Sequence, residues 1–304
     1  MGFKEALKRF RRLLARQSLF LCSLTVKYLP RKWLYSFAHS VARLAYYIAA
    51  KQRRIALESL EIAFSNQLDM LKREAIAREC FQNMAKSGVE LLYILEAPQI
   101  AKDLVRIEGK GYLDEALSKG NGVIAVSAHF GNFPLELTKL RQDGYKVNVI
   151  LRRMRDDKVE DFLEKRRQMM GIHSIHSTPR QACVDNSLKA LRNNEVLFIQ
   201  LDQNFGTGGV FVTFFGIQAA TAIGPVILAL RTQAPIIPMF IVREPDNSHR
   251  IIIKPEVIIE KKDTQEETIQ YNIQKITSII ESQIRKYPQE WGWIHRRWKS
   301  RPTA

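Results

Sequence analysis

Cysteine is scarce in this chain, and its scarcity excludes two kinds of protein. The three cysteines, Cys22, Cys80 and Cys183, lie far apart among 304 residues and form no CxxC pair. A small domain held together by disulfides needs more cysteines, and a structural zinc site needs ligands at close spacing. The sequence therefore predicts a protein of a reducing compartment that holds no structural zinc.

Long apolar runs and flexible linkers are lacking as well. Residues 18–29 are mostly apolar, but they number about a dozen and include Lys27, whereas a helix needs about 20 apolar residues to cross the hydrocarbon core. No convincing small-residue cleavage site follows them, so a signal peptide is not expected. No repeat or long Gly/Ser/Pro linker divides the chain, and its length suits one large α/β domain or two small ones.

Acidic residues are fewer than basic ones: the chain has 31 Asp and Glu and 47 Lys and Arg, which gives a formal net charge of +16. Such an excess implies an acidic partner, and nucleic acid, an anionic membrane surface and an acidic protein all fit. No RNA- or DNA-binding motif is legible in the sequence. A nucleic-acid-binding protein is therefore the less favoured alternative.

The N-terminal segment, residues 1–52, favours the membrane surface. Apolar residues recur at helical spacing at Phe3, Leu7, Phe10 and Leu14. Cations fill other positions of the same segment: Lys4, Lys8, Arg9, Arg11, Arg12 and Arg16. A further helix expected near residues 33–50 places one apolar face at Phe37, Val41, Leu44 and Ile48. We expect membrane-associating amphipathic helices, with simple packing on the domain, or a span formed by merging the first two segments, as the alternatives.

Residues 53–304 predict a second unit, in which strands alternate with helices. After helices near 53–64 and 71–95, strands are expected near 123–128, 146–151, 195–201, 236–242 and 250–259. Helices are expected near 134–142, 156–170, 180–192, 221–232 and 264–286, and a loop over 204–216. This alternation predicts an α/β fold with a mainly parallel central sheet flanked by helices.

One stretch, residues 123–134, combines the features of a catalytic turn. An apolar strand leads to His129, a Gly-Asn turn follows, and Pro134 opens a helix. Open α/β sheets carry their chemistry at the carboxyl ends of strands, and a helix N-terminus disfavours imidazolium, so His129 is expected to be neutral. A second strand ends at Asp202 in the same manner. We therefore predict that His129 is a general base and that Asp202 is the acid that orients it. The alternative is that His129 has only a structural role.

The order of several motifs carries a resemblance to a known family. After the segment around His129 come the sequences Asp202-Gln-Asn-Phe-Gly, Gly209-Val-Phe-Val-Thr-Phe-Phe-Gly216, Thr221 with Gly224-Pro225, and Trp291-Gly-Trp-Ile-His-Arg-Arg-Trp-Lys299. From about Arg53 to Arg301 the chain resembles the bacterial lysophospholipid and lipid A late acyltransferases. The resemblance implies an αβα fold like that of glycerol-phosphate acyltransferases, an acyl carrier protein thioester as donor, a lipid acceptor, and a place on the cytoplasmic face of the inner membrane.

The sequence departs from this family at one position. Relatives usually show His-x4-Asp/Glu, but Pro134 stands where the acid is expected. The nearest acid, Glu136, is a candidate catalytic residue, although a structural role in the first helical turn is favoured. Asp202 is the better partner, since mycobacterial mannoside-acylating relatives are thought to use an acid in the matching segment. Pro134 also leaves open a non-catalytic lipid-binding relative.

Further residues are candidates for holding the substrate. Backbone N–H groups at Gly131 and Asn132 are expected to bind the oxyanion. The expected substrate-binding residues are Arg152, Arg166, Arg167, Asn204 and Thr221. His173 and His176 are expected in a loop, and no metal or nucleotide site is legible. The C-terminal tryptophans suit a membrane interface, binding of the acidic carrier or a packed tail. Trp291 and Trp293 are favoured for the core, and the neighbouring cations are expected in solvent.

Overall fold

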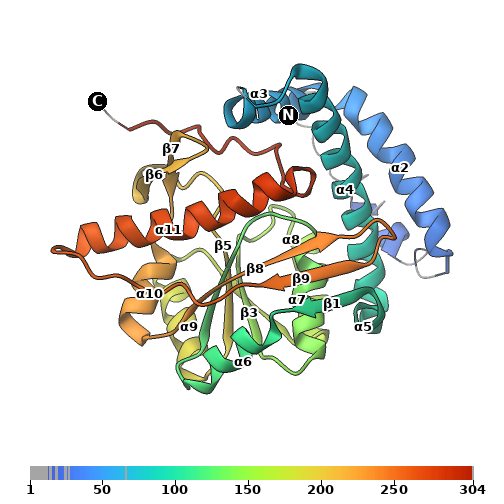
Figure 1. Ribbon diagram of the computed structural model, residues 1–304. Helices are drawn as coiled ribbons and strands as arrows, with labels where there is room; N and C mark the ends of the chain where they lie inside the picture. Colours follow the sequence, from blue (N-terminus) through green and yellow to red (C-terminus); the bar gives the residue numbers. More distant parts are fainter. Residues whose placement is uncertain are drawn as a thin grey trace, which may run out of the picture.

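A computed structural model describes residues 13, 16–17, 20–23, 26, 28–65 and 67–302 (Figure 1). Its helices are α2 (Arg31–Ile48), α3 (Ala50–Phe64), α4 (Met70–Glu96), α5 (Ala101–Leu104), α6 (Lys110–Ser118), α7 (Phe133–Gln142), α8 (Asp157–Met169), α9 (Arg180–Arg192), α10 (Gly224–Thr232) and α11 (Gln265–Lys286). Its strands are β1 (Val105–Glu108), β2 (Val123–Ser127), β3 (Val147–Leu151), β4 (Ile172–His176), β5 (Val196–Gln200), β6 (Val210–Phe214), β7 (Ile217–Thr221), β8 (Ile236–Arg243) and β9 (His249–Ile253).

The core of the fold is a seven-stranded sheet in the order β1-β9-β8-β2-β5-β3-β4. Every neighbouring pair is parallel except β8 and β9. The predicted α/β class with a mainly parallel sheet is confirmed. Because side chains alternate along a strand, the two faces of the sheet build separate apolar clusters.

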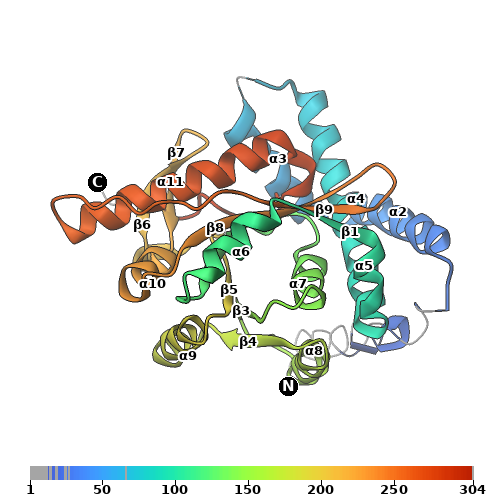
Figure 2. The ribbon, with the colours of Figure 1, turned by 60° about the horizontal axis from the view of Figure 1, so that its bottom comes forward.

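Helices cover both faces of this sheet (Figure 2). On one face, Val123 and Ala125 of β2 join a cluster that includes Leu113 of α6 and Leu140 of α7. On the opposite face, Ile124 of β2 joins a cluster that includes apolar residues of α9, α10 and α11. The carboxyl ends of the central strands therefore form an edge of a rigid, doubly covered sheet, which suits a site that must hold its geometry.

Two segments expected as loops are strands instead. Within the predicted loop over 204–216, β6 begins an antiparallel hairpin with β7, and α10 starts at Gly224 rather than at residue 221. Phe215 and Gly216 both have positive φ, as a tight two-residue hairpin turn requires. His173 and His176, expected in a loop, lie in β4. Short strands of this kind carry little periodic signal, which is why the sequence pattern missed them.

Helix α2 packs on α4 with a face other than the one the sequence singled out. The buried residues of α2 are Leu34, Ala38, Ala42 and Tyr46. The expected apolar face instead remains exposed, with 59% of Phe37, 60% of Leu44 and 72% of Ile48 accessible. None of the described helices is both long and apolar enough to cross a bilayer. The cationic helix expected at residues 3–16 lies outside the described residues apart from Leu13 and Arg16, and the predicted division at residue 52 falls within α3.

Candidate active site

The register of two neighbouring parallel strands brings His129 and Asp202 together. Ser127 of β2 pairs with Gln200 of β5, and each strand is followed two residues later by one member of the pair. The His129 Nδ1 atom lies 2.8 Å from Asp202 Oδ1. The predicted pairing of histidine and acid at adjacent strand ends is thus present in the geometry.

A buried tryptophan completes the surroundings of the acid. Asp202 is fully buried, and its second oxygen, Oδ2, accepts a hydrogen bond of 2.8 Å from the indole N–H of Trp291. With both oxygens engaged, the carboxylate cannot rotate away from the imidazole. Because an ionised carboxylate only accepts hydrogen bonds, it holds the proton of neutral His129 on Nδ1 and leaves the lone pair on Nε2.

His129 and Asp202 also shift each other's pKa, and the pKa of His129 shifts in the direction opposite to the one expected from the sequence. Burial works to raise the pKa of Asp202, but the charge of His129 and the hydrogen bonds it receives hold that pKa well below its usual range. Burial works to lower the pKa of His129, but Asp202 outweighs it, so the pKa is raised above 6.5. The expected depression by the helix N-terminus is therefore wrong, because the carboxylate in direct contact has the larger effect.

Two residues that sequence reasoning missed lie at the proton-accepting side of His129. The side-chain amide of Gln203 lies 3.0 Å from His129 Nε2 and 3.4 Å from His295 Nε2. The two imidazole rings have their centroids 5.1 Å apart. Burial, followed by the charge of His129, lowers the pKa of His295, so a second neutral imidazole stands beside the base. The position of His295 in the C-terminal Trp-rich motif was the available signal.

The turn after His129 is anchored by the C-terminal segment. Gly131 has a φ of +57°, and a Cβ there would lie 2.0 Å from the carbonyl oxygen of Ile241, so only glycine fits. Its N–H donates to the carbonyl of Glu290 at 2.8 Å, and the N–H of Gly292 donates to the carbonyl of His129 at 3.1 Å. The expected role of Gly131 as an oxyanion donor is therefore wrong, because its N–H is already bonded.

Asn132 forms the N-cap of α7. Its side-chain Oδ1 accepts from the N–H of Leu135 at 3.3 Å, and its Nδ2 donates to Glu90 at 2.8 Å. The first N–H groups of a helix have no partner within the helix. The backbone N–H of Asn132, one turn from His129, therefore stays a candidate oxyanion donor.

Glu136 does not contact the base. It is fully buried, and neither carboxylate oxygen has a hydrogen-bond partner among the described residues. Burial raises its pKa to about 8, so the side chain is mostly neutral at pH 7. The expectation of an ionised carboxylate stabilised by the helix N-terminus is wrong, since desolvation outweighs the dipole, and the catalytic assignment has no geometric support.

We expect Glu136→Gln to leave acyl transfer within about twofold of wild type, because Gln resembles the neutral acid. The wild-type protein should lose stability as pH rises from about 4.5 to about 8, since the folded chain holds a proton that the unfolded chain releases. At about 1.4 kcal/mol per pKa unit, this loss is of order 5 kcal/mol. Thermal unfolding of both proteins from pH 5 to 9 measures it; a Tm difference that does not grow with pH contradicts the assignment.

The three candidate arginines have different surroundings. Arg152 is exposed just past the carboxyl end of β3, and no described residue forms an ion pair with it. Arg166 donates to Glu96 at 2.5 Å. The guanidinium of Arg152 is thus accessible to a phosphate group, whereas that of Arg166 forms an ion pair with Glu96 of α4.

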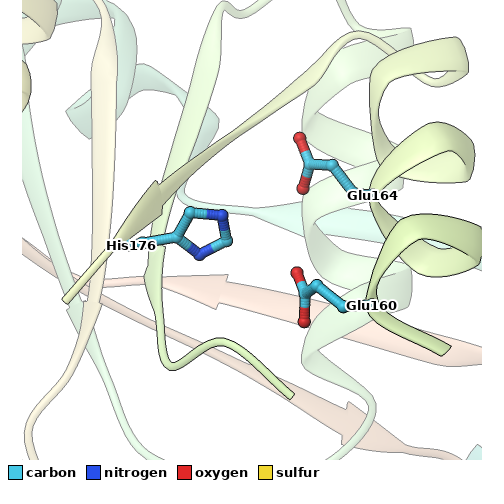
Figure 3. A group of neighbouring side chains, drawn as sticks. All are labelled: Glu160, Glu164 and His176. Atoms are coloured by element: carbon cyan, nitrogen blue, oxygen red, sulfur yellow. The ribbon is translucent and has the colours of Figure 1, made fainter. Parts of the chain in front are cut away.

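Arg167 belongs to a closed network between α8 and β4. It donates to Glu160 at 3.0 Å, to Glu164 at 3.0 and 3.3 Å, and to the hydroxyl of Ser174 at 2.8 Å. Its predicted role in substrate binding is therefore unsupported, because its Nε and Nη2 donors are bound to these partners. Figure 3 shows Glu160, Glu164 and His176 facing one another, with ligand atoms within 4.8 Å. The two carboxylates are already bound by the guanidinium of Arg167 and, at Glu160, by the backbone N–H of Met154, so the group is part of an ion-pair network.

Asn204 and Thr221 both form hydrogen bonds with the C-terminal tail. Asn204 pairs with Ser300 through its Nδ2 at 3.1 Å and its Oδ1 at 3.2 Å. Thr221 is fully buried; its hydroxyl donates to the carbonyl of Ala219 and accepts from Arg297. Both residues hold the C-terminal tail against the sheet, so the assignment of Thr221 as a substrate contact is wrong.

The tail itself is part of the core. Trp291, Trp293 and Trp298 are buried, which confirms the packed-tail alternative. Arg297, expected in solvent, is fully buried and donates to the carbonyl of Gln203 at 3.2 Å. Burial lowers its pKa to about 10. Lying beside the Asp202 loop, this cation helps to balance the buried carboxylate.

Comparison with known proteins shows the family to which the chain belongs. A family model described as bacterial lipid A biosynthesis acyltransferase matches residues 1–300. The lipid A biosynthesis lauroyltransferase of Escherichia coli K12 is 24% identical over 282 residues, covering 91% of this chain and 88% of the relative. The palmitoleoyltransferase of lipid A biosynthesis from the same strain is 26% identical over 263 residues, covering 84% and 81%.

More distant similarities reach other lipid acyltransferases. A phosphatidylinositol mannoside acyltransferase of Mycobacterium tuberculosis H37Rv is 27% identical over 142 residues, covering 46% of this chain and 45% of the relative. The solved 1-acyl-sn-glycerophosphate acyltransferase of Thermotoga maritima matches 84% of this chain and 97% of its own, with a TM-score of 0.39 and 12% identity. Since the family model matches nearly the whole chain, the protein belongs to the bacterial lipid A biosynthesis acyltransferases and is an acyltransferase.

Proposed function

We propose that this acyltransferase moves a fatty acyl chain from an acyl carrier protein thioester to a hydroxyl of a lipid A precursor, or of a related glycolipid or lysophospholipid. The observation that carries the proposal is the hydrogen-bonded pair of His129 and Asp202 at adjacent strand ends. The printed activities of the relatives, lauroyl and palmitoleoyl transfer in lipid A biosynthesis, support the substrate class. Because the pair is intact, Pro134 does not favour a non-catalytic lipid-binding relative.

His129 acts as the general base. Its Nε2 accepts the proton of the acceptor hydroxyl while the oxygen attacks the thioester carbonyl carbon. The tetrahedral intermediate collapses with cleavage of the C–S bond, and the imidazolium returns the proton to the leaving thiolate. The amide of Gln203 must yield its position at Nε2 to the hydroxyl. No covalent enzyme intermediate is needed, since the acceptor oxygen is itself the nucleophile.

Charge at the site supports the polar parts of both substrates. The N-terminus of α7, with the N–H of Asn132, stabilises the oxyanion. Arg152, free and exposed at the end of β3 beside β5, is the proposed contact for a lipid phosphate. The net charge of +16 attracts an acidic carrier protein and anionic lipid alike.

The protein associates with the anionic membrane surface through helix α2. Its outward face carries Trp33, Phe37, Leu44 and Ile48, each at least 59% exposed. The opposite face packs on α4. A helix with one apolar face on the protein and another in the open suits the interface between headgroups and acyl chains, and not a crossing of the bilayer.

The double variant Phe37→Ser/Leu44→Ser is expected to bind phosphatidylglycerol vesicles at least about tenfold more weakly, because burying each apolar side chain contributes about 1.5–3 kcal/mol. Flotation with vesicles measures the partition. The matched control is Ile258→Ser, which removes a similarly exposed apolar side chain beside α11, where the Ile258 carbonyl accepts from Lys275, and should bind as wild type. Equal weakening by both variants would argue against α2 as the membrane-facing surface.

Acyl transfer by the purified full chain tests the function itself. The protein is incubated with acyl carrier protein thioester or acyl-CoA, and with a lipid A precursor or lysophospholipid in mixed micelles. Mass spectrometry should show an acceptor heavier by one acyl chain with the carrier protein as donor. The absence of product with every acceptor would contradict the proposal, and a preference for acyl-CoA would overturn the donor assignment.

A further inference from the structure

Glu90 of α4 is a buried carboxylate that the chemistry above does not use. Its side chain is 6% exposed, and that of its partner Arg243 of β8 is 5% exposed. Arg243 binds both carboxylate oxygens, one of them at 2.8 Å. Tyr35 of α2 donates to Oε1 at 2.8 Å, and Asn132 donates to Oε2 at 2.8 Å. Glu90 therefore connects α2, β8 and the turn that carries His129.

The chemistry of this carboxylate decides how Asn132 is oriented. The two ends of an asparagine amide have nearly the same shape, but one accepts hydrogen bonds and the other donates them. An ionised Glu90 can only accept, so it requires the NH2 end of Asn132. The oxygen end is thereby turned toward the N–H of Leu135, where it caps α7. A neutral partner at residue 90 would remove this requirement.

The orientation of Asn132 reaches the base through a short piece of chain. Only Phe130 and Gly131 separate Asn132 from His129, and Gly131 lies so close to Ile241 that no Cβ would fit. The cap also sets where the first turn of α7 begins, and with it the backbone N–H proposed to face the oxyanion. A displacement of about 1 Å at such a site can cost about a hundredfold in rate.

We propose that Glu90 is a positioning residue for acyl transfer, which fixes the amide of Asn132 and through it the catalytic turn. The inference rests on the proposed role of His129, but it concerns a carboxylate on a different element of the fold. Arg243 keeps this carboxylate ionised and immobile in the interior, and without that partner a buried charge would be costly. The Glu90 carboxylate thus affects the position of His129 indirectly, by fixing the orientation of the Asn132 amide.

Exchanging the two partners tests this inference. Asn132→Asp places two carboxylates against each other, and Glu90→Gln removes the strict acceptor. We expect each single variant to lower kcat by about 10- to 100-fold, with KM for the donor changed much less. In the double variant Glu90→Gln/Asn132→Asp, the new amide can donate to the new carboxylate, which still caps α7. Its kcat should recover at least about tenfold over either single variant.

Asn272→Asp is the matched control, because Asn272 is a fully buried, hydrogen-bonded asparagine of α11 away from the site. It should lower the Tm about as much as Asn132→Asp while keeping kcat near wild type. If either single variant fails to fold, the double variant decides, since folding with transfer activity supports the pairing. A folded double variant as slow as the folded single variants, or single variants with wild-type kcat, would overturn the proposal.

Hydrogen exchange at Leu135 gives a readout that does not depend on catalysis. The amide of Leu135 donates to both the side chain and the carbonyl of residue 132. It should exchange faster in both single variants, where residue 132 is no longer held in its capping position by Glu90, and regain protection in the double variant. If the wild-type protein transfers no acyl group, the proposed function fails while this measurement still tests the role of Glu90. Unchanged exchange in all variants would count against Glu90 even in an active enzyme.

Discussion

His129→Ala is expected to lower kcat by about 10²- to 10⁴-fold, which is the usual contribution of a general base. The KM of the variant for the thioester donor should change little, because the imidazole acts on the hydroxyl of the acceptor and not on the donor. Its Tm should fall, because the buried carboxylate of Asp202 loses its hydrogen-bond partner, so rates are compared at a temperature where both proteins are folded. Steady-state transfer assays over a range of donor concentrations separate kcat from KM.

His173→Ala is a suitable control for this variant, because His173 is an exposed histidine on β4. It should retain wild-type kcat. Full turnover by His129→Ala would refute the assignment of the base. A loss shared equally by the two variants would point to a general effect of removing histidine.

Asp202→Asn is expected to lower kcat by about 10²- to 10⁴-fold, comparable to the loss of an acid from a catalytic triad. An amide at this position can donate its NH2 group to His129 Nδ1. Nδ1 would then be unprotonated and the imidazole proton would reside on Nε2, so Nε2 would have no lone pair to accept the hydroxyl proton. It can still offer an oxygen to the indole of Trp291. The change should therefore appear in kcat rather than in KM.

Glu136→Gln is the matched acid-to-amide control for Asp202→Asn, since both carboxyls are fully buried. Only the Asp202 variant should lose activity. Circular dichroism and Tm measurements ensure that folded proteins are compared. If Asp202→Asn retained activity within about threefold while Glu136→Gln lost it, the partner of the base would be the acid of α7 instead.

Much of this site could be predicted because its two main residues follow apolar strands. The patterns near 123–128 and 195–201 identified β2 and β5, and parallel strands bring their carboxyl ends to one edge. That placed His129 near Asp202 without knowledge of their contact. The direction of the His129 pKa was missed, because a direct ion pair outweighs a helix dipole and a pattern cannot show which is nearer.

The remainder depends on contacts between distant parts of the chain. Trp291 lies 89 residues from Asp202 in sequence, and Glu90 lies 42 residues from Asn132, so no local spacing relates them. Burial was also invisible: Arg167 and Thr221 looked available for substrate, but the fold surrounds them with partners. Hydrogen-bond saturation is a property of the packed structure, and sequence pattern indicates only which residues have the capacity.

The apolar pattern of helix α2 was identified correctly, but the pattern did not show whether that face is buried in the protein or exposed. The sequence identified an apolar face at Phe37 and Leu44, as a buried helix or a membrane helix would have. Only the fold distinguishes these cases, because the small residues Ala38 and Ala42 provide the contact with α4. Leu34 and Tyr46 are buried with them, whereas Phe37, Leu44 and Ile48 stay exposed.

The pH dependence of single-turnover acyl transfer tests the general-base role of His129 most directly. In wild type the rate should rise with pH through a midpoint above 6.5, because Asp202 raises the pKa of His129 and the base form is lost as pH falls. In Asp202→Asn the residual rate should show a midpoint below 6.5, since burial without the carboxylate lowers that pKa. A wild-type rate that is flat between about pH 5 and 9, or a midpoint unchanged by the substitution, would contradict the account.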